Sequence, residues 1–311
     1  MTSQRIISPI SVALTLLVII SCSRSISDNE FRILFSVNDF REIDESSIQT
    51  RTSLVNGTNF VWSEKDTVGI YPNTGGQVYF AMSAGAGTKN ASFDGGGWAF
   101  KPSALYYSYY PFIGNTYLDK HHIPVSYLGQ HQPTATSIDH IGQYDFMITP
   151  ATSAESGGLS FNYSHLNCLI RVTAKLPMGT YTKMTIKSPD KDFIIKGYYD
   201  LSSPHPVIIA DETSDQLSIT LDSINVDSET NLVVYMMSAP VNLKGKEIIV
   251  SFFTTTSTIY SQVKAPSREY TAETIGGLTC SDMVRTGDII DGVGVDEYTF
   301  PDDDESIIIN P

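Results

Sequence analysis

The sequence predicts an all-β protein made of two tandem antiparallel β-sandwich domains. Short strand-like segments recur about every ten to fifteen residues, and no long segment has a helical period. Charged residues make up only 17% of the chain, below the roughly one quarter that is typical of soluble domains. Hydroxyl, glycine, asparagine and tyrosine residues replace them, a composition that suits sheets with one wet face.

The first strand is expected at 31–37, where Phe31, Ile33, Phe35 and Val37 share one face. An acidic stretch rich in serine and threonine follows and is expected to be an exposed loop. Later strands are expected at 60–62, 67–71, 77–82, 105–112, 159–163, 166–172, 181–187, 192–199, 216–221, 232–237 and 247–254. Regular short strands separated by turn residues are typical of β-sandwiches.

A domain boundary is expected near 149–158, where a run of Pro, Ala, Thr, Ser, Glu and Gly interrupts the strand pattern. The first sandwich would then span 31–152 and the second 153–292. Residues 293–311 would form a C-terminal tail. Each domain would then consist of strands that are consecutive in the sequence.

The amino terminus has the pattern of a bacterial lipoprotein signal peptide. Ile6 to Ile20 is mostly apolar, too short for a membrane-spanning helix, and ends in Ser21-Cys22. Residues 1–21 would be removed, Cys22 would carry the lipid, and 22–30 would be a polar tether. An ordinary secretory signal with an incidental cysteine is the alternative. The localisation that follows is the outer membrane or the cell surface.

Several functional classes find no support in the sequence. The formal net charge of −14 disfavours nucleic acid as a partner. No nucleophile motif, zinc motif or phosphate loop occurs, so we expect no enzyme activity, no catalytic residue, no metal and no cofactor. The acidic run 302–305 is expected to be a solvated spacer. Cys168 is expected to be a small buried hydrophobe, and whether it pairs with Cys280 is left open.

The tyrosine-rich segment 105–112 allows two interpretations. On an alternating strand half of its rings fill a core, whereas clustered tyrosines on a surface can stack against a sugar. The core is the favoured interpretation. The second would make the protein an anchored outer-membrane glycan-binding lipoprotein that uses tyrosines 106–110.

An ordered set of segments resembles the fimbrillin-like lipoproteins of Bacteroidales, the subunits of type V pili. The resemblance covers about 50–172 well and the rest by architecture. The segments that carry it are Arg51-Thr52, Phe60-Val61-Trp62, Asp66 to Tyr71, Tyr109 to Phe112, Gln130 to Pro133, Tyr144 to Met147, Leu159 to Phe161 and Ser164 to Leu166.

The resemblance implies two transthyretin-like β-sandwich domains and export as an outer-membrane lipoprotein. It also implies cleavage by an arginine-specific protease, polymerisation by strand exchange and a role in adhesion to a host or bacterial surface ligand. Other fimbrial subunits, identical or different, would be the partners. A cut after Arg51, or alternatively after Arg41, would release the lipid anchor together with strand 31–37. Four apolar positions worth about 6–12 kcal/mol of gross burial would be uncovered.

The expected donor of the replacing strand is the tail 293–310. One candidate has Val293 and Val295 on one parity but Tyr298 and Phe300 on the other, so its register requires a bulge. A second candidate is the apolar triplet Ile307, Ile308 and Ile309. The resemblance does not decide between a stalk subunit and a tip or accessory subunit.

Overall fold

The computed structural model describes residues 32–42, 60–101, 103–114, 118–135, 137–153, 158–227 and 231–286, and the backbone of 289–290 and 293–294. Throughout these ranges the regular structure is β-strand, apart from one 3₁₀ helix, η1 (Ile141–Tyr144). The all-β prediction is confirmed. The signal peptide 1–21, the tether 22–30 with Cys22, and Phe31 lie outside the described residues.

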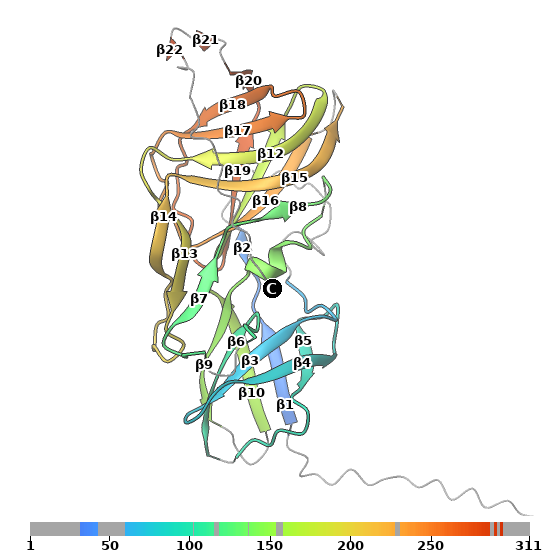
Figure 1. Cartoon of the computed structure of the whole chain (residues 1–311), viewed down its shortest axis with the longest axis vertical. Coiled ribbons are helices and arrows are strands. Elements are labelled where there is room, and N and C mark those ends of the chain that lie inside the picture. The colour runs from blue at the N-terminus through green and yellow to red at the C-terminus, as the bar shows by residue number, and fades with distance from the viewer. Residues whose placement is uncertain are drawn as a thin grey trace, which may run out of the picture. The chain divides into compact units, whose positions relative to one another are not determined.

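The N-terminal half forms a closed β-barrel (Figure 1). The strand order is β1 (Arg32–Val37), β10 (Gly158–His165), β9 (Met147–Ser153), β6 (Leu105–Tyr110), β3 (Thr67–Pro72), β4 (Val78–Ala84) and β5 (Asn90–Asp94). The barrel closes because β1 pairs with β10 on one side and with β5 on the other. The leading strand β1 therefore completes this sheet.

The C-terminal half contains two larger sheets and one smaller sheet. The four-stranded sheet has the order β16 (Asn231–Ser238), β11 (Cys168–Lys175), β19 (Thr274–Cys280) and β2 (Arg41–Glu42). The six-stranded sheet has the order β20 (Val284–Arg285), β18 (Ile259–Lys264), β17 (Ile248–Thr254), β12 (Gly179–Lys187), β15 (Gln216–Val226) and β8 (His131–Gln132). The small sheet is β14 (Ile209–Ser214), β13 (Phe193–Tyr199) and β7 (Ile123–Ser126). Among the described residues, β21 (Ile289–Ile290) and β22 (Val293–Gly294) form a separate two-stranded sheet.

Strand pairing does not follow the predicted boundary between 152 and 153. β10 lies after that boundary, yet it pairs with β1 and β9 of the barrel. Conversely, β7 and β8 lie before it, yet they pair with β13 and β15. β2 pairs with β19 near the other end of the chain. The described chain from residue 32 onward belongs to one compact unit, because its hydrogen bonds join distant segments.

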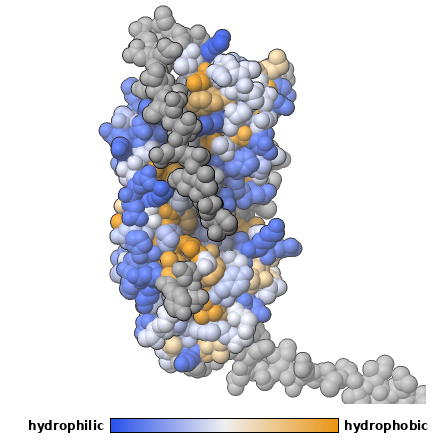
Figure 2. Space-filling model, in the orientation of Figure 1, coloured by the Kyte–Doolittle hydropathy of each residue, from blue (hydrophilic) through white to orange (hydrophobic). Residues whose placement is uncertain are grey.

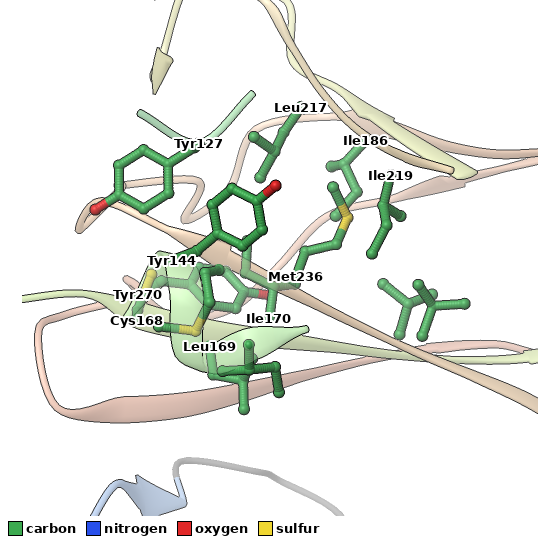
Figure 3. Packing of buried hydrophobic residues seen from close by; sticks show 14 of the residues in the cluster. Tyr127, Tyr144, Cys168, Leu169, Ile170, Ile186, Leu217, Ile219, Met236 and Tyr270 are labelled. Atoms are coloured by element: carbon green, nitrogen blue, oxygen red, sulfur yellow. The ribbon is translucent and has the colours of Figure 1, made fainter. Parts of the chain in front are cut away.

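Two apolar clusters hold these sheets together. The barrel interior contains Phe35, Trp62, Phe80 and Phe161, all of them at most 2% exposed. The larger cluster joins the four-stranded and six-stranded sheets. In Figure 3, Ile170 and Met236 face Ile186, Leu217 and Ile219, and these side chains are all buried.

The described surface in Figure 2 is mostly hydrophilic or neutral, with small separate hydrophobic patches. The large apolar residues that are exposed come from different elements: Leu34, Tyr79, Leu128, Met178, Val207, Ile209 and Val263. Within the described ranges no helix has the length and apolarity that a membrane span requires.

β16 is an outer strand of its sheet, and two glutamine side chains bond to the outer edge of its backbone. The Gln130 amide accepts a hydrogen bond from the Met237 N–H and donates one to the Met237 carbonyl, both at 2.8 Å. The Gln132 amide accepts from the Tyr235 N–H at 3.0 Å and donates to the Val233 carbonyl at 2.9 Å. The two glutamines therefore satisfy the backbone groups that a neighbouring strand would satisfy, and the edge cannot template another chain.

Replacing Gln132 with Leu should lower the free energy of unfolding by about 1–3 kcal/mol, because it leaves buried β16 backbone groups unsatisfied. Denaturant unfolding measures the change. His131→Leu is the matched control, since His131 is exposed and its loss should change stability by less than about 0.5 kcal/mol. Equal effects of the two substitutions would show that the glutamine bonds contribute nothing.

Candidate assembly site

The leading segment, residues 32–42, lies across both halves of the molecule. β1 runs parallel to β10 over all six of its residues, from Arg32 opposite Gly158 to Val37 opposite Tyr163. Its pairing with β5 covers only two residues. Four residues after β1 ends, β2 continues as a parallel neighbour of β19. One extended segment therefore completes the barrel with β1 and supplies β2 as the outer strand of the four-stranded sheet.

The alternation predicted for β1 is confirmed where its side chains are described. Phe35 and Val37 are 1% and 5% exposed, and Ile33 is partly buried against the same cluster, whereas Leu34 is 58% exposed. The Phe35 ring lies 4.7 Å from the Phe93 ring and 5.3 Å from the Phe161 ring, measured between centroids. The inward face of β1 is thus part of the barrel core.

The buried parity changes between β1 and β2. Phe40 is 5% exposed although it is three residues after Val37, so the bend at Asn38 and Asp39 turns the opposite parity inward. The Phe40 ring stacks on the ring of His165 with 3.9 Å between centroids. The period-two pattern of a strand does not predict the burial of Phe40, because the strand is interrupted between Val37 and Phe40.

A buried ion pair lies beneath this bend. His165 and Asp145 have fully buried side chains, and Nδ1 of His165 is 2.9 Å from the Asp145 carboxylate. The second ring nitrogen, Nε2, is 2.9 Å from the Asn38 carbonyl oxygen. Burial by itself lowers the pKa of His165, but the Asp145 charge and the hydrogen bonds to Asp145 and Asn38 outweigh it, with a smaller contribution from Glu273, so the pKa is raised. The protonated ring can donate to both partners at once.

Polar contacts fix the rest of the bend. Lys89 forms an ion pair with Asp39, and the Asn38 amide donates to the Ser164 hydroxyl at 3.0 Å. The backbone N–H of Arg41 donates to the Glu273 carbonyl at 2.7 Å. The Arg41 side chain is exposed, but its backbone is held by hydrogen bonding next to β19.

Phe40 also lines a cavity of about 800 Å³. Other lining residues are Phe60, Trp62, Asp66, Tyr110 and Ile141. Burial raises the pKa of Asp66, in spite of hydrogen bonds from the Ser63 N–H and the Tyr110 hydroxyl. The lining combines aromatic residues with charged residues such as Lys65 and Asp139, and Phe40 places the cavity beside the leading segment.

The other predicted site residues are only partly described. The candidate cleavage residue Arg51 and the donor candidates Val295, Tyr298, Phe300, Ile307, Ile308 and Ile309 lie outside the described residues. Val293 is described only as backbone in β22, where it pairs with Ile290.

The tyrosines of β6 serve the core. Tyr106, Tyr109 and Tyr110 are buried, and their hydroxyl groups contact the Lys101 backbone, Gln77 and Asp66 respectively. Only Tyr107 is partly exposed, with the Lys120 ammonium 5.0 Å from its ring centroid. This arrangement supports the core interpretation and offers no row of stacked surface rings.

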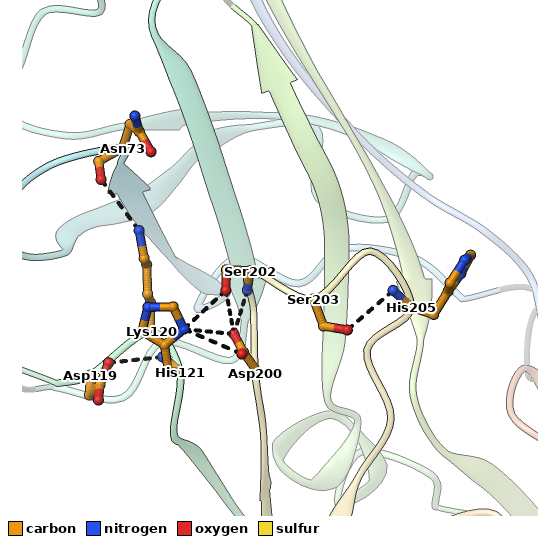
Figure 4. A network of polar contacts seen from close by, with 8 residues as sticks. All are labelled: Asn73, Asp119, Lys120, His121, Asp200, Ser202, Ser203 and His205. Carbon is orange, nitrogen blue, oxygen red and sulfur yellow. Dashed lines mark hydrogen bonds and ion pairs between the residues drawn. The ribbon is translucent and has the colours of Figure 1, made fainter.

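A surface cluster of Ser202, His121 and Asp200 does not have the geometry of a catalytic relay (Figure 4). Both the Asp200 carboxylate, at 3.2 Å, and the Ser202 hydroxyl, at 3.0 Å, approach the same nitrogen of His121, Nδ1. A relay requires the acid and the nucleophile on opposite ring nitrogens. Among the described residues no group of three or more His, Cys, Asp or Glu side chains could hold a metal ion.

The two described cysteines are buried and unpaired. Burial raises the pKa of Cys168 to about 12 and that of Cys280 to about 11, so both thiols stay protonated at neutral pH. Cys168 is a small buried hydrophobe, as predicted.

Comparison with solved structures identifies the class of fold. The chain is similar to a "putative cell adhesion protein" from Bacteroides ovatus, with a TM-score of 0.52 and 13% identity over 82% of this chain and 96% of that one. A protein from Bacteroides uniformis described in the same words has a TM-score of 0.50 and 13% identity over 75% of this chain and 94% of that one. No protein-family model matches the chain, and no curated relative matches it.

The chain therefore has the all-β fold of these two Bacteroides proteins, as the resemblance in its sequence implied. At 13% identity the likeness concerns the fold alone.

Replacing Phe35 with Ala should lower the free energy of unfolding by about 3–5 kcal/mol, because it opens a cavity in the barrel core. Leu34→Ala, one residue away on the exposed face, is the control and should cost less than about 0.5 kcal/mol. Urea unfolding measures both. A small effect of Phe35→Ala would mean that β1 contributes little to the barrel.

The raised pKa of His165 makes its contribution to stability depend on pH. The contribution is complete below the ordinary value of 6.5 and is lost as the pH rises through the raised pKa of the folded state. The stability difference between the native chain and His165→Gln should therefore shrink as the pH rises above 6.5. Denaturant unfolding at a series of pH values measures it, and a constant difference would contradict the charged state of His165.

Proposed function

We propose that this protein is a subunit of a surface fimbria, in a structural or a tip or accessory position, and that it supports adhesion without catalysis. It would assemble when proteolysis removes the leading segment and a strand of another subunit replaces it. The observation that carries the proposal is the position of residues 32–42, which complete a barrel whose other strands remain one connected ladder.

The connectivity of the barrel supports removal of β1. Without it, β10, β9, β6, β3, β4 and β5 still form neighbouring pairs in that order. β10 pairs with β9 at Ser164 and His165. The other edge of β10, which pairs with β1 from Gly158 to Tyr163, would lose its hydrogen-bond partner. Its inward side chains Leu159, Phe161 and Tyr163 are buried and would still attach it to the core.

The energetics favour capture of a new strand. Phe35, Val37 and Phe40 together account for roughly 5–9 kcal/mol of gross burial, at 1.5–3 kcal/mol for each side chain. Removing them would uncover this apolar surface and the unpaired edge of β10 at the same time. β-strand addition satisfies both, because main-chain bonds supply affinity and side-chain sites supply specificity.

The structure bears on the choice of cleavage residue. Proteases act on extended exposed segments, whereas the backbone of Arg41 is bound to Glu273 and paired with β19. A cut after Arg51 would release β1, the bend and β2 together. We therefore favour Arg51 as the cleavage residue.

The pattern of the first 22 residues supports the remaining part of the proposal. A lipid on Cys22 would hold the uncut chain in the outer membrane, and the cut after Arg51 would free it from that anchor. Loss of the anchor and gain of an open acceptor would then result from one event.

Treatment with an arginine-specific protease should yield a chain that begins at Thr52 and forms ladders of high mass. Arg51→Ala should block both changes, whereas the control Arg41→Ala should leave them intact. Amino-terminal mass spectrometry and gels run under mild denaturation measure the outcome. A correctly cut chain that stays monomeric under all conditions would refute assembly by strand exchange.

A further inference from the structure

The cavity beside Phe40 has the size of a binding site for a small organic molecule. Its volume of about 800 Å³ lies within the range of about 300–1,000 Å³ that is usual for such sites. Its walls come from parts of the chain that are far apart in the sequence: the leading segment, the segment before β3, the end of β6, the η1 region and β11. The fold therefore builds this cavity, and no single loop does.

The inner lining offers a hydrogen-bond acceptor, whereas its aromatic donor groups are already used. The Trp62 N–H donates to the Lys89 carbonyl at 3.0 Å, and the Tyr110 hydroxyl donates to the Asp66 carboxylate at 2.9 Å. The backbone N–H of Ser63 donates to the other oxygen of Asp66 at 2.6 Å. A carboxylate has about four acceptor positions, so about two of them stay available on Asp66.

The charge of Asp66 favours a positively charged ligand group. Both hydrogen bonds to its carboxylate come from neutral donors. Burial raises the pKa of Asp66, and the nearby charge of Asp145 raises it further, although the two hydrogen bonds act in the opposite direction. A cation against this carboxylate would stabilise its ionised form, because opposite charges attract more strongly where water is excluded.

The aromatic and aliphatic walls suit a cation with an apolar body. Phe40, Phe60 and Ile141 supply apolar surface, and the face of an aromatic ring also attracts a positive charge. The rings of Phe40 and Phe60 pack against His165, but the charge of His165 is paired with Asp145. The inner lining therefore combines apolar and aromatic surface with the carboxylate of Asp66.

The other charged lining residues contribute less. Lys65 and Asp139 are exposed, so water screens them, and their charges are opposite. They leave the preference for charge to the more buried Asp66.

We propose that this cavity binds a small organic cation with an apolar body, such as an alkylammonium compound. The positive group lies against the Asp66 carboxylate, and the apolar groups contact Phe40, Phe60 and Ile141. Binding at this site does not depend on the proposed assembly, because all of these residues belong to the uncut chain.

Calorimetric titration of the uncut chain with choline and with dimethylbutanol, its neutral carbon isostere, tests the preference for charge. The two compounds have the same shape and both carry a hydroxyl, so they differ in the positive charge. Choline should bind about tenfold more tightly. Equal affinities would overturn the inference, because they would reveal an apolar cavity that does not select a cation.

Replacing Asp66 with Asn should weaken choline binding about tenfold, because the charge opposite the ligand is removed. Asp139→Asn is the matched control, since Asp139 also lines the cavity but is exposed, and it should change the affinity by less than about twofold. Undiminished choline binding by a folded Asp66→Asn protein would overturn the assignment of Asp66.

A second variant tests the cavity without touching the hydrogen bonds of Asp66. Ile138 is half-buried and lines the cavity, so Ile138→Trp should fill part of it and remove measurable choline binding. Val263→Trp, at an exposed position of β18 outside the lining, is the control and should leave binding unchanged. Near-ultraviolet circular dichroism checks that both variants are folded. Normal binding by Ile138→Trp would show that choline binds elsewhere and would overturn the inference.

Two further results of the titration would also overturn it. Tighter binding of glucose than of choline would assign the cavity to a neutral, hydroxyl-rich ligand. Absence of any heat of binding at about 10 mM choline would show that no complex as weak as about 1 mM forms. Either result would leave the proposed assembly untouched, because the titration measures the uncut chain alone.

Discussion

Parallel pairing between β1 and β10 is the constraint on which the rest of the structure depends. The two strands are separated by more than one hundred residues in sequence, and the other barrel strands all lie between them. β1 contributes core side chains and backbone bonds, but it is the first strand described and no later strand depends on its covalent position. In the proposed assembly, another strand of similar pattern would replace this segment.

The buried pair of His165 and Asp145 holds the junction between β1 and β2 in place. Burying two charges is costly, and such a pair is retained only where its geometry and hydrogen bonds compensate. Here the His165 ring contacts the Asp145 carboxylate through Nδ1 and the Asn38 carbonyl through Nε2, and it supports the ring of Phe40.

The protein manages two sheet edges in different ways. The edge of β16 is covered permanently, because Gln130 and Gln132 are part of the chain that continues into the fold. The edge of β10 is covered by a segment near the amino terminus, which a single cut could separate. Free edges promote unwanted association, so the glutamine bonds keep the β16 edge from pairing with another strand.

The sequence by itself determined the all-β class and the buried face of β1, because alternation along a strand is a local property. For β6 alternation predicts that half of the tyrosines are buried, whereas Tyr106 and the neighbours Tyr109 and Tyr110 are all buried. The sequence did not determine the barrel, the domain limits or the role of Phe40. Those depend on which strands pair, and the partners β1 and β10, β2 and β19, and β8 and β15 are distant in sequence. Hydrogen bonds between remote strands produce no periodic pattern in the sequence. Only the tertiary structure therefore decided that β1 closes the barrel and that His165 packs against the segment between β1 and β2.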